Sequence, residues 1–127
     1  MIIDLTAYTA AALLLLRIII AIVFFSSGKS HVANPVERGK SIGLPPAATT
    51  VLGIAEIAGA ISIAFGVFTQ VGAVLLMCTM LGAMYKKIVV WNTGFYAKEG
   101  YGWHYDLLLF LGCLVLFTTA GGMYVLY

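Results

Sequence analysis

Four apolar stretches of about 20 residues each dominate the sequence, and few charged residues interrupt them. They cover residues of about 5–27, 47–68, 71–91 and 103–126. Because a helix rises 1.5 Å per residue, each stretch can cross the ~30 Å hydrocarbon core of a bilayer. Strands of a membrane barrel would be about half as long and would alternate apolar with polar residues. The sequence therefore predicts an all-α fold, a four-helix transmembrane bundle, in one domain over residues 1–127.

Composition excludes an ordinary soluble domain. Hydrophobic residues make up 62% of the 127 residues and charged residues only 9%, against roughly half and a quarter in soluble domains. A chain of this length cannot hide so much apolar surface, and a disordered chain would have the opposite composition. The net charge of +2 is too small to indicate nucleic-acid binding. The two cysteines form no cluster with histidine, so no metal or haem site is predicted.

The polar loop between the first two stretches predicts a short interfacial helix. Asn34-Pro35 is typical of a helix start, because asparagine caps the helix and proline suits its first position. Gly43 is typical of a helix end. Apolar side chains between these points would let the helix lie on the membrane surface. At the start of the chain, the lack of a basic segment before the apolar run argues against a cleaved signal peptide.

Six of the seven basic residues fall on one side of the predicted bundle. An even number of spans places the first and last loops on the same side, and the positive-inside rule makes that side cytoplasmic. We therefore expect a multi-pass protein of the cytoplasmic (inner) membrane whose N- and C-termini both face out. The six basic residues are Lys29, Arg38, Lys40, Lys86, Lys87 and Lys98.

Two charged residues interrupt the first and second stretches at similar predicted depths. Arg17 lies 11 residues before Gly28, and Glu56 lies 10 residues after Pro46. A charge at the centre of a bilayer costs several kcal/mol, and two parallel hydrogen bonds from arginine to a carboxylate offset most of that cost. We therefore expect a buried Arg17–Glu56 ion pair. Such a pair either only fixes the helix register or also lines a polar site that binds a ligand or moves a proton.

A second group of polar residues is expected near the cytoplasmic face. Lys86 and Lys87 are consecutive and point about 100° apart on a helix, so one can reach lipid phosphates while the other meets Asp106 or Glu56. The alternative is that these residues only anchor the bundle at the interface. The group comprises Lys29, His31, Lys86, Lys87, His104, Tyr105 and Asp106. The aromatic residues expected to line the polar sites are Phe24, Trp91, Trp103 and Tyr105.

Several short motifs, in their order and spacing, resemble those of the DoxX family of small four-helix membrane proteins. The motifs are Arg17, Gly28-Lys29, Gly43-Leu44-Pro45-Pro46, Gly53-Ile54-Ala55-Glu56, Gly66-Val67-Phe68-Thr69 and Gly102-Trp103-His104-Tyr105-Asp106. The resemblance implies a bacterial or archaeal cytoplasmic membrane protein. Some members of the family are subunits of thiosulfate:quinone oxidoreductases or associate with terminal oxidases, and others are linked to thiol and oxidative-stress systems.

Two functions follow as hypotheses. The first is an accessory or quinone-interacting component of a membrane redox system. Since the sequence has no haem, iron–sulfur or flavin motif, the chain would be at most one subunit of a quinone-linked oxidoreductase. The second is a non-enzymatic bundle that docks or stabilises partner proteins in the lipid membrane. A transporter is a third and weaker alternative, because nothing in the sequence suggests broken helices or a duplicated half. A homo-oligomer is compatible with each hypothesis.

Overall fold

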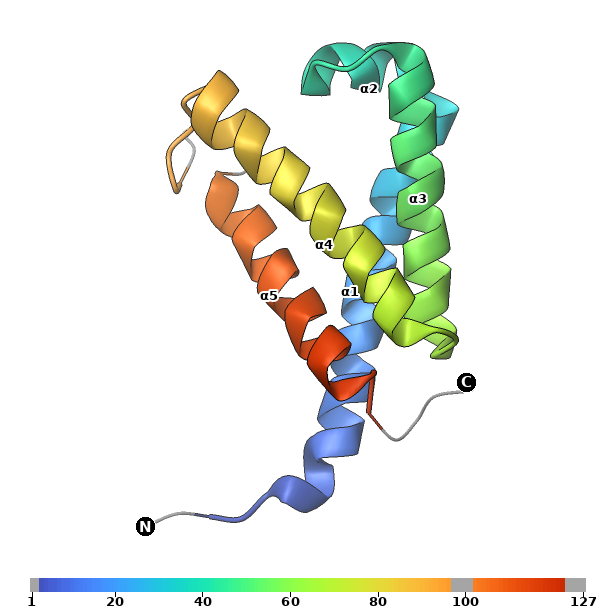
Figure 1. Ribbon diagram of the computed structural model, residues 1–127, viewed down its shortest axis with the longest axis vertical. Helices are drawn as coiled ribbons and strands as arrows, with labels where there is room; N and C mark the ends of the chain where they lie inside the picture. The colour runs from blue at the N-terminus through green and yellow to red at the C-terminus, as the bar shows by residue number, and fades with distance from the viewer. Residues whose placement is uncertain (1–2, 97–101, 123–127) are drawn as a thin grey trace.

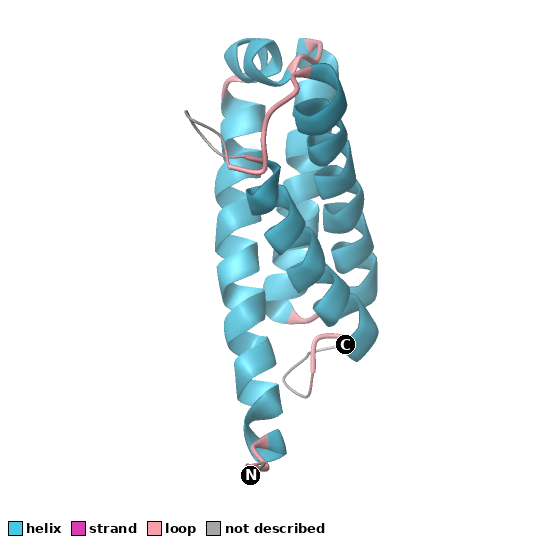
Figure 2. Ribbon diagram, turned by 90° about the vertical axis from the view of Figure 1, so that its left-hand side faces the viewer, coloured by secondary structure: helices cyan, strands magenta, loops and turns pink. Residues whose placement is uncertain are grey.

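All regular structure in the described residues is helical. A computed structural model describes residues 3–96 and 102–122, and its long helices lie side by side (Figure 1, Figure 2). The predicted all-α fold is therefore confirmed. The helices are α1 (Thr9–Ala33), α2 (Pro35–Ile42), α3 (Pro46–Phe65), α4 (Thr69–Tyr85) and α5 (Trp103–Thr119), with a 3-10 turn η1 (Thr6–Tyr8) before α1 and a π-helical turn η2 (Lys86–Val90) that continues α4.

Three helical stretches are long and apolar enough to cross a membrane. They are Thr6–Ala33, Pro46–Phe65 and Thr69–Val90. The fourth expected span is shorter than predicted, because α5 is a mostly apolar helix of 17 residues that ends at Thr119. Ala120 takes a left-handed backbone conformation with φ 55°, which stops a helix. The remainder of that expected span, beyond residue 122, lies outside the described residues.

The distribution of side chains is that of a protein surrounded by lipid. Large apolar side chains face outward, and many polar side chains face inward. The exposed apolar side chains include Ile22, Ile61, Leu81 and Leu108. The buried polar and charged side chains are Arg17, His31, Thr49, Glu56, Thr69 and Asp106. Exposed apolar side chains are unfavourable in water but favourable against lipid tails. The chain is therefore an integral membrane protein.

Glycine pairs set the closest helix contacts. α1 packs against α3, α3 against α4, and α4 against α5. Where α1 meets α3, a Cβ atom on either Gly28 or Gly53 would lie 2.7 Å from the carbonyl oxygen of the other. Gly59 and Gly72 face each other in the same way between α3 and α4, at 3.3 and 3.2 Å. Small residues at these positions let the helix backbones approach closely, as in other membrane helices.

The first loop is shorter than expected because α1 continues through Gly28 to Ala33. The short predicted helix follows at once as α2, with Pro35 in its first turn and Gly43 at its end with φ 73°. α2 packs on the start of α3, where a Cβ atom on Gly39 would lie 2.9 Å from the Thr49 hydroxyl. Gly39 therefore allows α2 to pack tightly against the start of α3.

One end of the molecule holds α2, the end of α4 with η2, and the start of α5 (Figure 1). The opposite end holds the turn from α3 to α4. We call the first end the basic end. Within the described residues, it carries Lys29, Arg38, Lys40, Lys86 and Lys87.

Candidate functional site

The buried Glu56–His31 pair joins α3 to α1 close to the basic end. Glu56 is 2% exposed and His31 is 4% exposed. The Nδ1 atom of His31 lies 3.4 Å from Oε1 of Glu56. The Gly28–Gly53 contact makes this approach possible, because each glycine lies opposite a member of the pair on the other helix. A Cβ atom on Gly28 would lie 3.1 Å from Cβ of Glu56. A Cβ atom on Gly53 would lie only 2.9 Å from Cβ of His31.

Ser27 completes the contacts of this pair on α1. The His31 Nδ1 atom lies 2.8 Å from the Ser27 carbonyl oxygen, one turn earlier on the helix. The Ser27 hydroxyl lies 3.4 Å from the same nitrogen and also donates a hydrogen bond to Glu56. The carboxylate and the imidazole are therefore held in a fixed relation by backbone and side-chain contacts within the apolar bundle.

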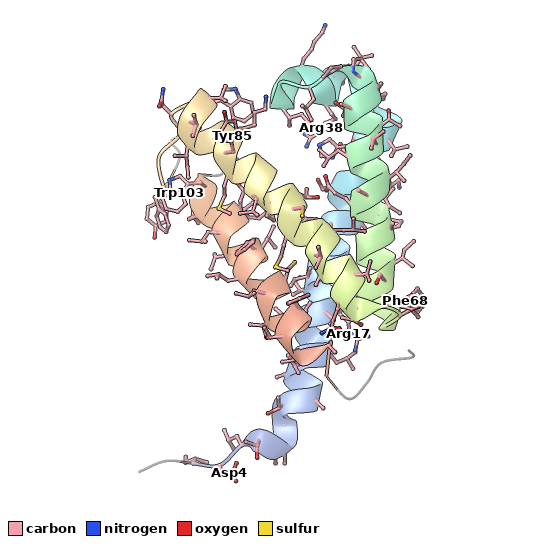
Figure 3. All side chains as sticks on the ribbon, in the orientation of Figure 1. Asp4, Arg17, Arg38, Phe68, Tyr85 and Trp103 are labelled. Carbon is pink, nitrogen blue, oxygen red and sulfur yellow. The ribbon has the colours of Figure 1, made fainter. Side chains whose placement is uncertain are left out.

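Arg38 approaches the pair from α2. Its side chain points from α2 toward the interior of the bundle (Figure 3). It interacts electrostatically with both His31 and Glu56. Among the described residues, neither its Nε atom nor Nε2 of His31 has a hydrogen-bond partner, although both atoms are buried. Because buried polar atoms are nearly always paired, these two atoms mark a place for a further polar group. We call Ser27, His31, Arg38 and Glu56 the polar site.

Arg17 has a different environment from the one predicted. Its side chain is 1% exposed. Its Nε atom donates to the carbonyl oxygen of Ile63 at 2.9 Å, and Nη2 donates to that of Ala64 at 3.3 Å. These carbonyls belong to the last turn of α3, where helical partners are missing. The positive charge also faces the negative end of the α3 dipole, so Arg17 caps a helix inside the bundle.

The expected Arg17–Glu56 ion pair is not confirmed. Between described residues, the pairs within salt-bridge distance are His31–Glu56, in which the histidine is charged only if protonated, and Lys87–Asp106. The partners of Arg17 on α3 begin seven residues after Glu56, which is about 10 Å further along the helix. The depth estimate was wrong because it ended the first span near Gly28, whereas α1 continues to Ala33. The five additional residues shift Arg17 away from the level of Glu56.

One of the two lysines was expected to meet Asp106 or Glu56, and Lys87 contacts Asp106. Lys87 Nζ lies 2.8 Å from Asp106 Oδ2, and the Lys87 side chain remains 18% exposed. The same nitrogen lies 5.8 Å from the centre of the Tyr105 ring. Lys86 points elsewhere and donates to the Gly43 carbonyl at 3.3 Å, which ties η2 to the end of α2.

The remaining predicted residues do not join the polar site. His104 Nδ1 lies 2.6 Å from the Phe95 carbonyl oxygen, so this ring fixes the last loop. Trp103 packs edge-on against Phe95, and Trp91 is 42% exposed. Lys29 is exposed on α1. Phe24 differs from these residues, because it is 1% exposed and belongs to the core of the bundle.

The polar site combines a carboxylate, an imidazole and a guanidinium. Such groups in an apolar environment can bind a polar head group and exchange protons with it. Among the described residues, no three His, Cys, Asp or Glu side chains form a group that could hold a metal ion. An apolar groove of about 610 Å³ between α3 and α4 lies near the opposite end and includes Phe65 and Phe68. It has no titratable lining residue, so it is separate from the polar site.

Sequence reasoning placed His31 only in a broad interfacial group and missed its contact with Glu56. A signal was present in the spacing. Gly28 precedes His31 by three residues, and Gly53 precedes Glu56 by three residues. In an antiparallel crossing at two glycines, the residue one turn after each glycine lies over the glycine of the other helix, so His31 and Glu56 enter the same close contact. Arg38 had no comparable signal, because only the fold of α2 turns it inward.

Comparison with known proteins gives a family and one distant relative. The sequence model of the DoxX family matches residues 12–90. A Bacillus subtilis (strain 168) protein with the name "Putative oxidoreductase CatD" is 35% identical over 74 residues, which are 56% of this chain and 55% of that protein. The chain thus spans about half the length of this relative. No solved structure matches the sequence.

Proposed function

Because the chain belongs to the DoxX family, a family of membrane proteins, we propose that it is an accessory component of a membrane redox system and that the polar site binds the head group of a lipid-soluble quinone. The single observation that carries this proposal is the buried Glu56–His31 pair, with unpartnered polar atoms beside it. The sequence suggested that Arg17 and Glu56 line a ligand site. We now assign that role to His31, Arg38 and Glu56.

The energetic cost of the polar site supports a function. An ionisable side chain at membrane depth costs roughly 3 kcal/mol on insertion scales. Glu56 and His31 both lie on helices that are candidate spans. Buried ion pairs add little stability compared with apolar residues of similar size. A chain that needed only helix packing would keep apolar residues here, so the pair is better explained by a ligand.

The redox assignment draws on the relative with the oxidoreductase name. The sequence lacks haem, iron–sulfur and flavin motifs. In the proposed role the chain contributes hydrogen bonds and proton acceptors, and a partner subunit carries the electrons. The lipid membrane supplies the quinone, which reaches the polar site from the bilayer.

The orientation proposed from the sequence fits the distribution of basic residues. The basic end faces the cytoplasm by the positive-inside rule, and α5 serves as the fourth span of the bundle. Lys98 would belong to the same end but lies outside the described residues. In this arrangement the polar site lies in the cytoplasmic half of the membrane.

Quinone binding by the purified protein in lipid nanodiscs tests the proposal. Decylubiquinone is titrated against the wild-type chain, Glu56→Gln and Glu37→Gln. Glu37 is exposed on α2, so Glu37→Gln makes the same chemical change outside the polar site. We expect Glu56→Gln to weaken binding by about tenfold or more, because Glu56 contacts His31 and interacts with Arg38, and hydrogen bonds to charged groups are worth about 1.5–3 kcal/mol. Equal binding by the two variants, or no binding to the wild type, contradicts the proposal.

A docking bundle is the alternative function. Such a bundle would receive a partner through the basic end or through helix faces of small residues. The glycines of α1, α3 and α4 with the closest contacts instead face one another inside the chain. If the chain only docks partners, the titration would show no quinone binding. A stable partner protein would instead copurify after mild extraction.

A further inference from the structure

We propose that the ligand of the polar site binds through a hydroxyl group, which donates a hydrogen bond to Nε2 of His31. This inference rests on the proposed function and specifies the chemical class of the ligand. The site would then prefer a reduced ring with hydroxyl groups, such as a quinol, over the oxidised ring with carbonyl groups. Three properties of His31 and its neighbours favour such a ligand.

The first property is the position of the ring hydrogen on His31. Nδ1 lies 2.8 Å from the Ser27 carbonyl oxygen, which can only accept a hydrogen bond. Nδ1 must therefore carry the hydrogen. Glu56 Oε1, 3.4 Å from the same nitrogen, is also an acceptor. In a neutral imidazole, a hydrogen on Nδ1 leaves Nε2 with a free lone pair.

The second property is the positive charge beside His31. Arg38 is positively charged and interacts electrostatically with His31. A protonated His31 would place a second positive charge next to Arg38 inside an apolar bundle, which is costly at membrane depth. The neutral ring, with Nε2 as an acceptor, is therefore the form that the surroundings favour.

The third property is the pair of buried atoms without partners. Nε2 of His31 needs a donor, and Nε of Arg38 carries a hydrogen that needs an acceptor. A hydroxyl group supplies both, since its hydrogen can go to His31 while its oxygen accepts from an arginine. A carbonyl oxygen can only accept, so a quinone would satisfy Arg38 and leave His31 without a donor. An unsatisfied buried acceptor reduces affinity.

Three probes with the same ring separate these possibilities in nanodiscs that hold the full chain. The probes are decylubiquinol, decylubiquinone and the bis-O-methyl ether of decylubiquinol. We expect the quinol to bind about tenfold more tightly than either of the others, which corresponds to about 1.4 kcal/mol. We expect His31→Phe to remove this preference. Equal affinities for the three probes in the wild-type protein would overturn the inference, since a bound water would then suffice for His31.

A spectroscopic measurement tests the same inference without a change at the site. The sequence has two histidines, so His104→Gln leaves His31 as the only ¹⁵N-labelled imidazole. The ¹⁵N spectrum should show hydrogen on Nδ1 and none on Nε2, and quinol should shift the Nε2 resonance. Hydrogen on Nε2 in the free protein would overturn the inference. Binding of both quinol and quinone with equal affinity would leave the proposed function intact, whereas no binding of either probe would contradict the proposed function itself.

Discussion

Replacing Gly53 by alanine should separate α1 from α3 and weaken the Glu56–His31 contact. The added Cβ atom would lie 2.7 Å from the Gly28 carbonyl oxygen, 2.8 Å from Cγ2 of Val32 and 2.9 Å from Cβ of His31. Ordinary contacts begin at 3.4 Å, so the helices must move apart by about 0.7 Å. The backbone oxygen cannot turn away as a flexible side chain could. The 3.4 Å distance between His31 Nδ1 and Glu56 Oε1 would then exceed hydrogen-bond range.

Gly82 provides the matched control on α4. A Cβ atom at Gly82 meets nothing within 4 Å. Both substitutions gain helix propensity, by up to ~1 kcal/mol, so the difference between the variants isolates the packing cost. Overpacking a tight contact costs about 1–3 kcal/mol. We therefore expect Gly53→Ala to be less stable than Gly82→Ala by that amount.

The assay is reversible unfolding in mixed detergent micelles, followed by circular dichroism. The free energies of unfolding of the two variants are compared at the same micelle composition. Equal stabilities would refute the reasoning, because they would mean that α1 and α3 are not in contact at Gly53.

Two further substitutions test the other buried charges. Arg17→Met keeps an extended side chain but removes the donors to the Ile63 and Ala64 carbonyls. It should lower the free energy of unfolding by about 2 kcal/mol and leave quinone affinity unchanged. A loss of affinity equal to that of Glu56→Gln would contradict this assignment. Lys87→Met leaves the Asp106 carboxylate buried without its cation and should cost about 3 kcal/mol, measured by the same unfolding assay. The double variant Lys87→Met/Asp106→Leu should recover most of this loss, and failure to recover it would count against the ion pair.

Much of the fold follows from local sequence signals. Proline at a first helical position and glycine at a helix end act within one turn of the chain, so they require no knowledge of the rest of the fold. The start of α2 at Pro35 and its end at Gly43 were predicted on this basis and are confirmed. A contact of one of the two lysines with Asp106 or Glu56 was also predicted, because consecutive lysines cannot face the same way on a helix; Lys87 and Asp106 make that contact.

The sequence alone determined that this is an all-helical membrane protein with costly polar residues inside it. That conclusion depends on composition and on the length of apolar stretches, which no tertiary contact can change. Tertiary structure decided which polar residues meet. Gly28 could either end a helix or let a second helix approach, and only the packed structure shows that it does the latter. The resulting continuation of α1 brings His31 to Glu56 and moves Arg17 to the end of α3, because a shift of a few residues along a helix changes both the depth and the direction of every side chain.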